Sequence, residues 1–156
     1  MRTFLTKAFI ALAITTLGAL GADNSIGAWK LNAEKSKYTP APMPVKSLMI
    51  TREASDGGAK VTTTGEQADG TQINASYTVK YDGKDVQVTG NSPYDTIAVK
   101  QINANTLTDE RKKTGGSYHG TSRIVISGGG KTMTSTTKGT NAAGAAFTST
   151  FVFDKQ

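Results

Sequence analysis

The chain has 156 residues, no cysteine, a single histidine and a net charge of +6. This length suits one domain, and the lack of cysteine excludes disulfides, thiolate nucleophiles and soft metal ligands. The basic residues are scattered, and the one tight cluster, Arg111-Lys112-Lys113, follows directly on Asp109-Glu110. Nucleic-acid binding needs a basic stripe with interleaved aromatic residues, so we predict no nucleic-acid partner.

Residues 1–21 have the three-part layout of a secretory signal peptide. Arg2 and Lys7 form a basic start, an uncharged apolar run covers 8–17, and Ala19 and Gly21 occupy the −3 and −1 positions of a cleavage site. A run of this length is about half of the ~20 residues that span a bilayer. We therefore predict a cleaved leader, a mature domain over 22–156 without a stable membrane anchor, and a periplasmic or secreted location.

The mature chain opens with a predicted strand over 26–31, in which Trp29, the only tryptophan, shares a face with Leu31. Three of the four prolines follow at positions 40, 42 and 44, and they predict an extended connection, because proline lacks an N–H and keeps its predecessor out of the helical region. Nine further strand candidates come next: 45–53, 60–67, 71–81, 84–89, 96–102, 106–113, 117–127, 132–139 and 146–154.

Strict alternation is clearest over 73–81, where odd-numbered residues are apolar or aromatic and even-numbered ones are polar. Such a strand buries one face. Turn signals such as Asp56-Gly57-Gly58, Asp82-Gly83 and Gly128-Gly129-Gly130 separate the candidates and indicate tight antiparallel reversals. We predict an all-β fold, an antiparallel up-and-down β-barrel of about 8–10 strands, because closure removes exposed edges. A meandering sandwich is the alternative.

The residues that carry chemistry are few. His119 has no second histidine or cysteine with which to bind a metal, and no nucleophile elbow is present. Gly128-Gly129-Gly130-Lys131 lacks the spacing of a phosphate-binding loop, and Asp82, Asp85 and Asp95 lack the pattern of a calcium loop. We predict no metal, no cofactor and no enzymatic activity.

The segment Gly27-Ala28-Trp29, at the head of a meander of about ten strands, resembles the lipocalin and fatty-acid-binding protein superfamily. More specifically, the segments 81–91 and 95–100 resemble small exported bacterial proteins of the lipocalin-like type. The superfamily resemblance implies that Trp29, preceded by Gly27, plugs a closed barrel end and that the open end admits an apolar ligand.

The sequence departs from that superfamily in two respects. The proline-rich stretch cannot form the helical lid that fatty-acid-binding proteins carry between their first two strands. Those proteins also bind the ligand carboxylate with Arg and Tyr from late strands, whereas Tyr118 and Arg123 are five residues apart and so fall on opposite faces.

The aromatic residues are the main functional candidates. Tyr77, Tyr81, Phe147, Phe151 and Phe153 fall on the apolar faces of their strands, where they either fill a core or line a cavity. The specific function stays open. The leading hypothesis is a monomeric exported protein that binds a small apolar or amphipathic ligand at the barrel mouth between Tyr77, Tyr81, Phe147 and Phe151. The alternative is a non-catalytic interaction or inhibitor module with a filled barrel.

Overall fold

The computed structural model describes residues 22–156, so the predicted signal peptide lies outside the described residues. No helix long and apolar enough to cross a membrane occurs in this range. The described chain forms twelve strands: β1 (Gly27–Leu31), β2 (Lys37–Thr39), β3 (Val45–Ser55), β4 (Gly58–Gln67), β5 (Gln72–Lys80), β6 (Val86–Gln87), β7 (Thr89–Asn91), β8 (Thr96–Asn103), β9 (Thr106–Lys112), β10 (His119–Ser127), β11 (Thr132–Thr140) and β12 (Ala146–Lys155).

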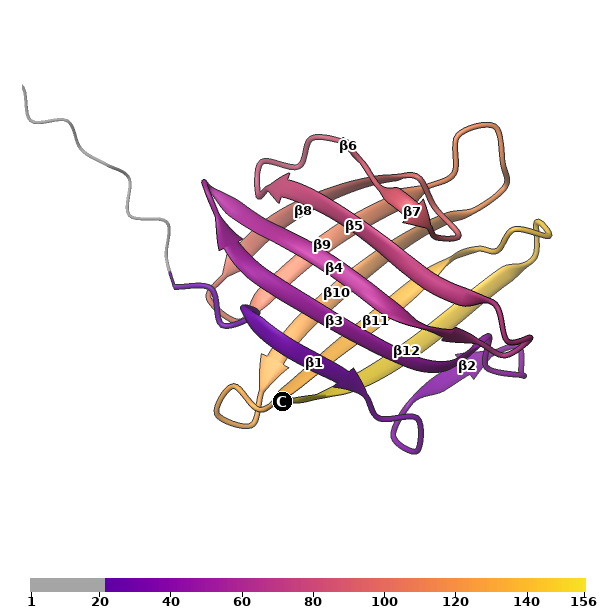
Figure 1. Ribbon diagram of the computed structural model, residues 1–156, viewed down its shortest axis with the longest axis horizontal. Coiled ribbons are helices and arrows are strands. Elements are labelled where there is room, and N and C mark those ends of the chain that lie inside the picture. Colours follow the sequence, from indigo (N-terminus) through magenta and orange to yellow (C-terminus); the bar gives the residue numbers. More distant parts are fainter. Residues whose placement is uncertain (1–21) are drawn as a thin grey trace, which may run out of the picture.

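The strands form one antiparallel sheet that rolls into a nearly closed barrel (Figure 1). The long strands pair in chain order from β3 to β5 and from β8 to β12. β12 returns to pair with β1, with Trp29 opposite Lys155 and Leu31 opposite Phe153. Figure 1 shows β3, β4 and β5 in front of β9, β10 and β11. The predicted all-β up-and-down barrel is confirmed, because the first and last long strands meet and complete the wall.

The structure has more strands than predicted, because one predicted connection contains a short strand and one predicted strand is divided into two that pair with different neighbours. Residues 37–39, expected in an extended connection, form β2, which continues the line of β1 along β12. The segment predicted as one strand over 84–89 divides into β6, which pairs with β8, and β7, which pairs with β5. These two short strands span the seam between β5 and β8 and bring the barrel close to complete closure.

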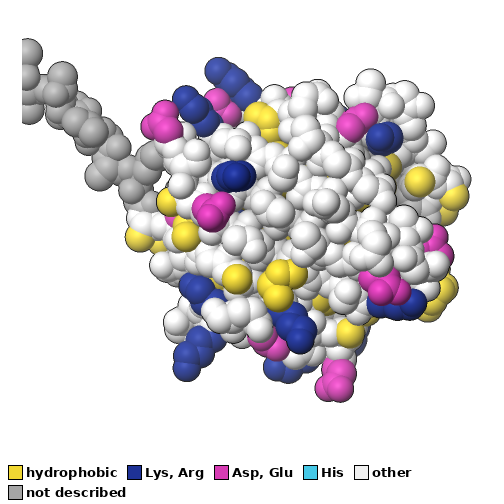
Figure 2. All heavy atoms as spheres, viewed as in Figure 1, with side chains coloured by type: hydrophobic (Ala, Val, Ile, Leu, Met, Phe, Trp, Pro, Cys, Tyr) yellow, Lys and Arg dark blue, Asp and Glu magenta, His cyan; other side chains and the backbone are white. Residues whose placement is uncertain are grey.

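The barrel has two different ends, because turns alternate between them in an up-and-down meander. One end holds the turns at 56–57, 104–105 and 128–131 together with residues 23–26. The other holds the turns at 40–44, 68–71, 92–95, 113–118 and 141–145. We call them the closed end and the open end. On the outer face shown in Figure 2, basic and acidic side chains are interspersed and form no single basic patch.

Trp29 fills the closed end. Its side chain is completely buried, and its Nε1 donates a hydrogen bond of 2.8 Å to the Ser25 carbonyl oxygen. The Lys155 ammonium lies 5.1 Å from the centre of the indole ring, within the range of a cation–π contact. Gly27 has a φ of +135°, and a Cβ there would lie 2.7 Å from Lys155 Cε. Glycine at this position therefore leaves room for Lys155 to cross toward the indole.

A buried cation reinforces the same end. Arg52 is only 4% exposed; its Nε donates to the Ser25 hydroxyl at 3.0 Å, and its NH2 donates to the Tyr81 hydroxyl at 3.3 Å. The Tyr81 hydroxyl in turn donates to Asp23 Oδ2. Burial by itself lowers the pKa of Arg52, but the nearby tyrosines and Asp23 outweigh that effect and raise it. This network ties residues 23–25 across the barrel base.

Candidate functional site

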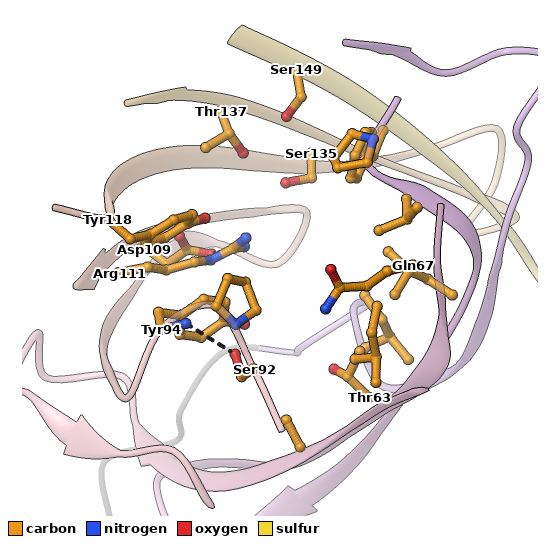
Figure 3. A pocket seen from close by; sticks show the side chains of 18 of the residues that line it. Thr63, Gln67, Ser92, Tyr94, Asp109, Arg111, Tyr118, Ser135, Thr137 and Ser149 are labelled. Carbon is orange, nitrogen blue, oxygen red and sulfur yellow. Dashed lines mark hydrogen bonds and ion pairs between the residues drawn. The ribbon is translucent and has the colours of Figure 1, made fainter. Parts of the chain in front are cut away.

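The barrel encloses a cavity of about 460 Å³ between the closed end and the open end. Volumes in this range hold small organic ligands. The wall from β3, β4 and β5 is mainly apolar and includes Leu48, Ile50, Val61, Ile73 and Tyr77. Figure 3 shows the more polar opposite side, with hydroxyl, carboxylate and guanidinium groups pointing inward. The barrel therefore contains a cavity, unlike the filled barrel of the alternative interaction-module hypothesis.

Three of the four aromatic residues predicted to bind a ligand line this cavity: Tyr77, Phe147 and Phe151. The placement of Tyr81 at the mouth is wrong. Tyr81 directly follows β5, which runs from the open end to the closed end, so its hydroxyl lies in the Arg52 and Asp23 network at the base. Alternation identified its face correctly but carried no information on its height in the barrel.

An arc of four aromatic rings lies toward the open end. Tyr94 stacks on Tyr118 with ring centres 5.8 Å apart, Tyr118 contacts Phe147 at 6.1 Å, and Phe147 stacks on Tyr38 at 5.4 Å. All four residues line the cavity, and they come from four different segments of the chain. Rings at these separations attract one another, so the arc gives the upper cavity a continuous aromatic surface.

Below the arc runs a polar belt, defined as Asp109, Ser122, Thr137 and Ser149. The strand register places these residues directly opposite one another across β9, β10, β11 and β12. Directly opposed residues in antiparallel strands share a face, and all four side chains are buried inside the barrel. The hydroxyls of Ser122 and Thr137 are hydrogen-bonded to each other at 2.9 Å. The belt makes one wall of the cavity rich in hydrogen-bonding groups, whereas the opposite wall is mainly apolar with Thr63 and Gln67 as polar members.

Asp109 and Arg111 form an ion pair at one end of the belt. Their side chains are two residues apart on β9, so both point inward, and Arg111 NH2 lies 2.7 Å from Asp109 Oδ2. The Arg111 guanidinium carbon lies 5.4 Å from the centre of the Tyr94 ring. Among the described residues, neither Asp109 Oδ1 nor Arg111 Nε, both buried, has a hydrogen-bond partner.

Burial and charge shift the ionisation of this group of residues. Burial alone lowers the pKa of Arg111, but Asp109 and the neighbouring tyrosines outweigh it and hold that pKa well above its usual value. Burial raises the pKa of Tyr94 and Tyr118, and the Arg111 charge offsets part of that rise. Arg111 is therefore a permanent cation, and both phenols stay protonated at neutral pH.

The other candidate groups lie away from the cavity. His119 is on the outer face of β10, half-exposed, with its Nε2 at 3.1 Å from Glu110 Oε1. Arg123 also lies on the outer face, whereas Tyr118 points inward, as their five-residue spacing predicted. Gly128-Gly129-Gly130 lies in the turn between β10 and β11. Over residues 22–156, no three His, Cys, Asp or Glu side chains converge as metal ligands.

Asp95 joins two loops at the open end. Its Oδ1 accepts hydrogen bonds from the Thr114 backbone N–H at 2.9 Å and from the Thr114 hydroxyl at 3.2 Å. Its Oδ2 lies 3.6 Å from the Lys113 ammonium. The hydrogen bond from the Thr114 backbone is the main reason that the pKa of Asp95 is lowered. Because Asp95 follows Tyr94, this contact also positions one end of the aromatic arc.

We expect acid to loosen this side of the open end. The pKa of Asp95 is lowered in the folded protein, so its contribution is present above the ordinary Asp value of about 4 and is lost as the pH falls through the folded pKa. Amide hydrogen exchange at Thr114 should accelerate in that range. Asp95→Asn should show faster exchange at neutral pH already, whereas Asp56→Asn, at the closed end, should not. Equal protection of Thr114 in both variants would contradict this role.

Sequence reasoning missed the most polar part of the site. In the sequence, Asp109 and Arg111 belong to one cluster of charged residues, but Leu107, Asp109 and Arg111 are spaced two residues apart and so share a strand face. That spacing was the available signal. Tyr38 and Tyr94 gave none, because they reach the cavity from a short strand and a loop with no apolar alternation of their own.

Comparison with known proteins supports the fold. No protein-family model matches the sequence, and no curated protein is significantly similar to it. The chain is similar to a fatty-acid-binding protein of Schistosoma mansoni in complex with arachidonic acid, with a TM-score of 0.54 and 12% identity over 87% of this chain and 98% of that chain. A second similar structure is zebrafish ileal bile acid-binding protein complexed with cholic acid, with a TM-score of 0.48, 14% identity and coverage of 86% and 100%. The first comparison agrees with the predicted β-barrel fold.

Proposed function

We propose that this protein binds a small amphipathic ligand inside its barrel and does not act as an enzyme. The observation that carries the proposal is the cavity of about 460 Å³ with an apolar wall on one side and the polar belt on the other. Ligand sites typically combine a mainly apolar lining with a few placed polar groups. The Schistosoma protein of similar fold was solved with arachidonic acid, which supports the same broad class of ligand.

The two walls define how such a ligand lies. Its apolar part packs against Leu48, Ile50 and Val61, and its polar group faces the belt and Arg111. Entry is from the open end, where residues of the turns at 92–95 and 141–145 contribute to the lining. The proposed location is periplasmic or extracellular; this part of the proposal rests on residues 1–21 of the sequence.

Native mass spectrometry of the protein from its own export compartment, with lipid extraction in parallel, tests this function. We expect a co-purifying small molecule in the wild type. Tyr77→Trp and Phe151→Trp should displace it, because each adds volume to a residue that lines the cavity. Ile102→Trp is the matched control, since Ile102 is 55% exposed on the outer surface.

The opposite result is also informative. If the wild type carries no molecule and fails to take up an added apolar dye such as Nile red, the cavity does not serve ligand binding. If a molecule co-purifies equally with the wild type and both cavity variants, it lies elsewhere, and the proposed site is wrong.

A further inference from the structure

We infer that the polar group of the ligand is an uncharged group that both donates and accepts hydrogen bonds, such as an alcohol or a primary amide, and not a carboxylate. This inference rests on the proposed function and specifies the class of ligand at the same site. It is carried by the pairing of Asp109 with Arg111 and by the hydroxyl groups that line the same wall of the cavity.

The first step is the charge at the polar end of the cavity. The Arg111 guanidinium lies 5.4 Å from the Tyr94 ring of the aromatic arc, and Asp109, 2.7 Å from Arg111 NH2, carries the opposite charge. The pair is therefore neutral as a unit. A ligand carboxylate that approached Arg111 would also approach the Asp109 carboxylate, and like charges placed together in a buried site are strongly unfavourable.

The second step excludes the other charged residue of the lining. Arg52 also borders the cavity, but it is 4% exposed and already donates hydrogen bonds to Ser25 and Tyr81. The Tyr81 hydroxyl binds Asp23, so a carboxylate balances the Arg52 charge through one bridging group. Arg52 therefore already has its hydrogen-bond partners at the closed end and is not available to bind an anionic ligand.

The third step is the hydrogen-bonding pattern. The polar groups that the wall around Asp109 and Arg111 exposes to the cavity include the hydroxyls of Ser135, Thr137 and Ser149. A hydroxyl both donates and accepts hydrogen bonds, and an alcohol or a primary amide offers both complementary functions in one group. A carboxylate offers acceptors only.

The surroundings fit an uncharged group as well. Tyr94 and Tyr118 pack beside Arg111, and the raised pKa of each phenol keeps it neutral. The remaining members of the polar belt carry hydroxyl groups, which can donate or accept a hydrogen bond and add no charge. The site therefore offers several neutral hydrogen-bonding groups, and its charged residues, the Asp109–Arg111 pair and Arg52, already have partners within the protein.

A panel of three ligands with the same chain tests the inference: dodecanol, dodecanamide and dodecanoate, each measured by displacement of Nile red at pH 8, where dodecanoate is ionised. We expect the alcohol and the amide to bind at least about tenfold more tightly than the carboxylate. Asp109→Asn leaves Arg111 as an unbalanced cation and should reverse the order in favour of dodecanoate. Glu110→Gln is the matched control, because it removes the same charge from the adjacent, outward-facing residue and should leave the order unchanged.

The outcomes separate this inference from the proposed function. Failure of the wild type to bind Nile red or any of the three ligands overturns the proposed function. Tighter or equal binding of dodecanoate by the wild type overturns the uncharged head group alone. If Asp109→Asn does not fold, the double variant Asp109→Asn/Arg111→Gln replaces it, because it has no charge at the pair. This variant should bind all three ligands within about threefold of each other. If it still binds dodecanoate much more weakly than the other two ligands, the ion pair is not the cause of the discrimination.

Discussion

Trp29→Ala should lower the free energy of unfolding by about 3–5 kcal/mol, the usual cost of truncating a buried tryptophan. The indole is completely buried, fills the closed end, and donates a hydrogen bond to the Ser25 carbonyl oxygen. Its removal leaves a cavity beneath Lys155 and an acceptor without its donor. Urea denaturation followed by circular dichroism measures the loss, since the variant has no tryptophan for a fluorescence signal.

The control for this experiment is Ile102→Ala. Ile102 is the exposed large apolar residue of the described chain, and its truncation should change stability by no more than about 0.5 kcal/mol. If Trp29→Ala unfolds at the same urea concentration as the wild type, then Trp29 is not the plug of the closed end.

Arg52→Met should be nearly as damaging, with a loss of about 3 kcal/mol. Methionine preserves much of the side-chain length but removes the donors to Ser25 and Tyr81. It also removes the cation that balances Asp23, whose carboxylate accepts a hydrogen bond from Tyr81 at the barrel base. Removing one partner of a buried network is costly because the groups left behind, here the buried Ser25 hydroxyl and the half-buried Asp23 carboxylate, lose their compensation. Chemical denaturation of both proteins at pH 7 measures the difference.

A second substitution isolates that cause. Arg52→Met/Asp23→Asn no longer holds the uncompensated carboxylate and should recover about 1 kcal/mol or more relative to Arg52→Met alone. Arg123→Met removes the same charge from the outer face and should have little effect. If the double variant is no more stable than Arg52→Met, the loss comes from packing and not from the unbalanced charge.

The fold was predictable because its determinants are local. Alternation over 73–81 and turn signals such as Asp82-Gly83 specify strands and reversals between neighbours in the chain. In an up-and-down meander, neighbours in the chain are also neighbours in the sheet. The pairing of the short strands β2, β6 and β7 with strands that are not their neighbours in the chain was not predictable. Each has only two or three residues, too few to show the alternation of apolar and polar residues.

The site was predictable only in part, for a related reason. Alternation gives the face of a residue, so it identified Tyr77, Phe147 and Phe151 as inward residues. The position of a residue along the barrel axis depends on strand register, which alternation does not give. For this reason Tyr81 lies at the closed end, apart from the other three aromatic residues. The same register aligns Asp109, Ser122, Thr137 and Ser149 into one belt, although up to 40 residues separate them along the chain.

The amino-acid pattern alone therefore established the fold class and the inward faces of the long strands, because both follow from contacts between adjacent segments. Whether the barrel is filled or hollow depends on how all its walls meet, and the cavity of about 460 Å³ appears only when β12 pairs with β1 and the seam strands bridge β5 and β8. The same closure encloses the Asp109–Arg111 pair, so that a charge cluster in the sequence becomes part of the buried polar side of the cavity.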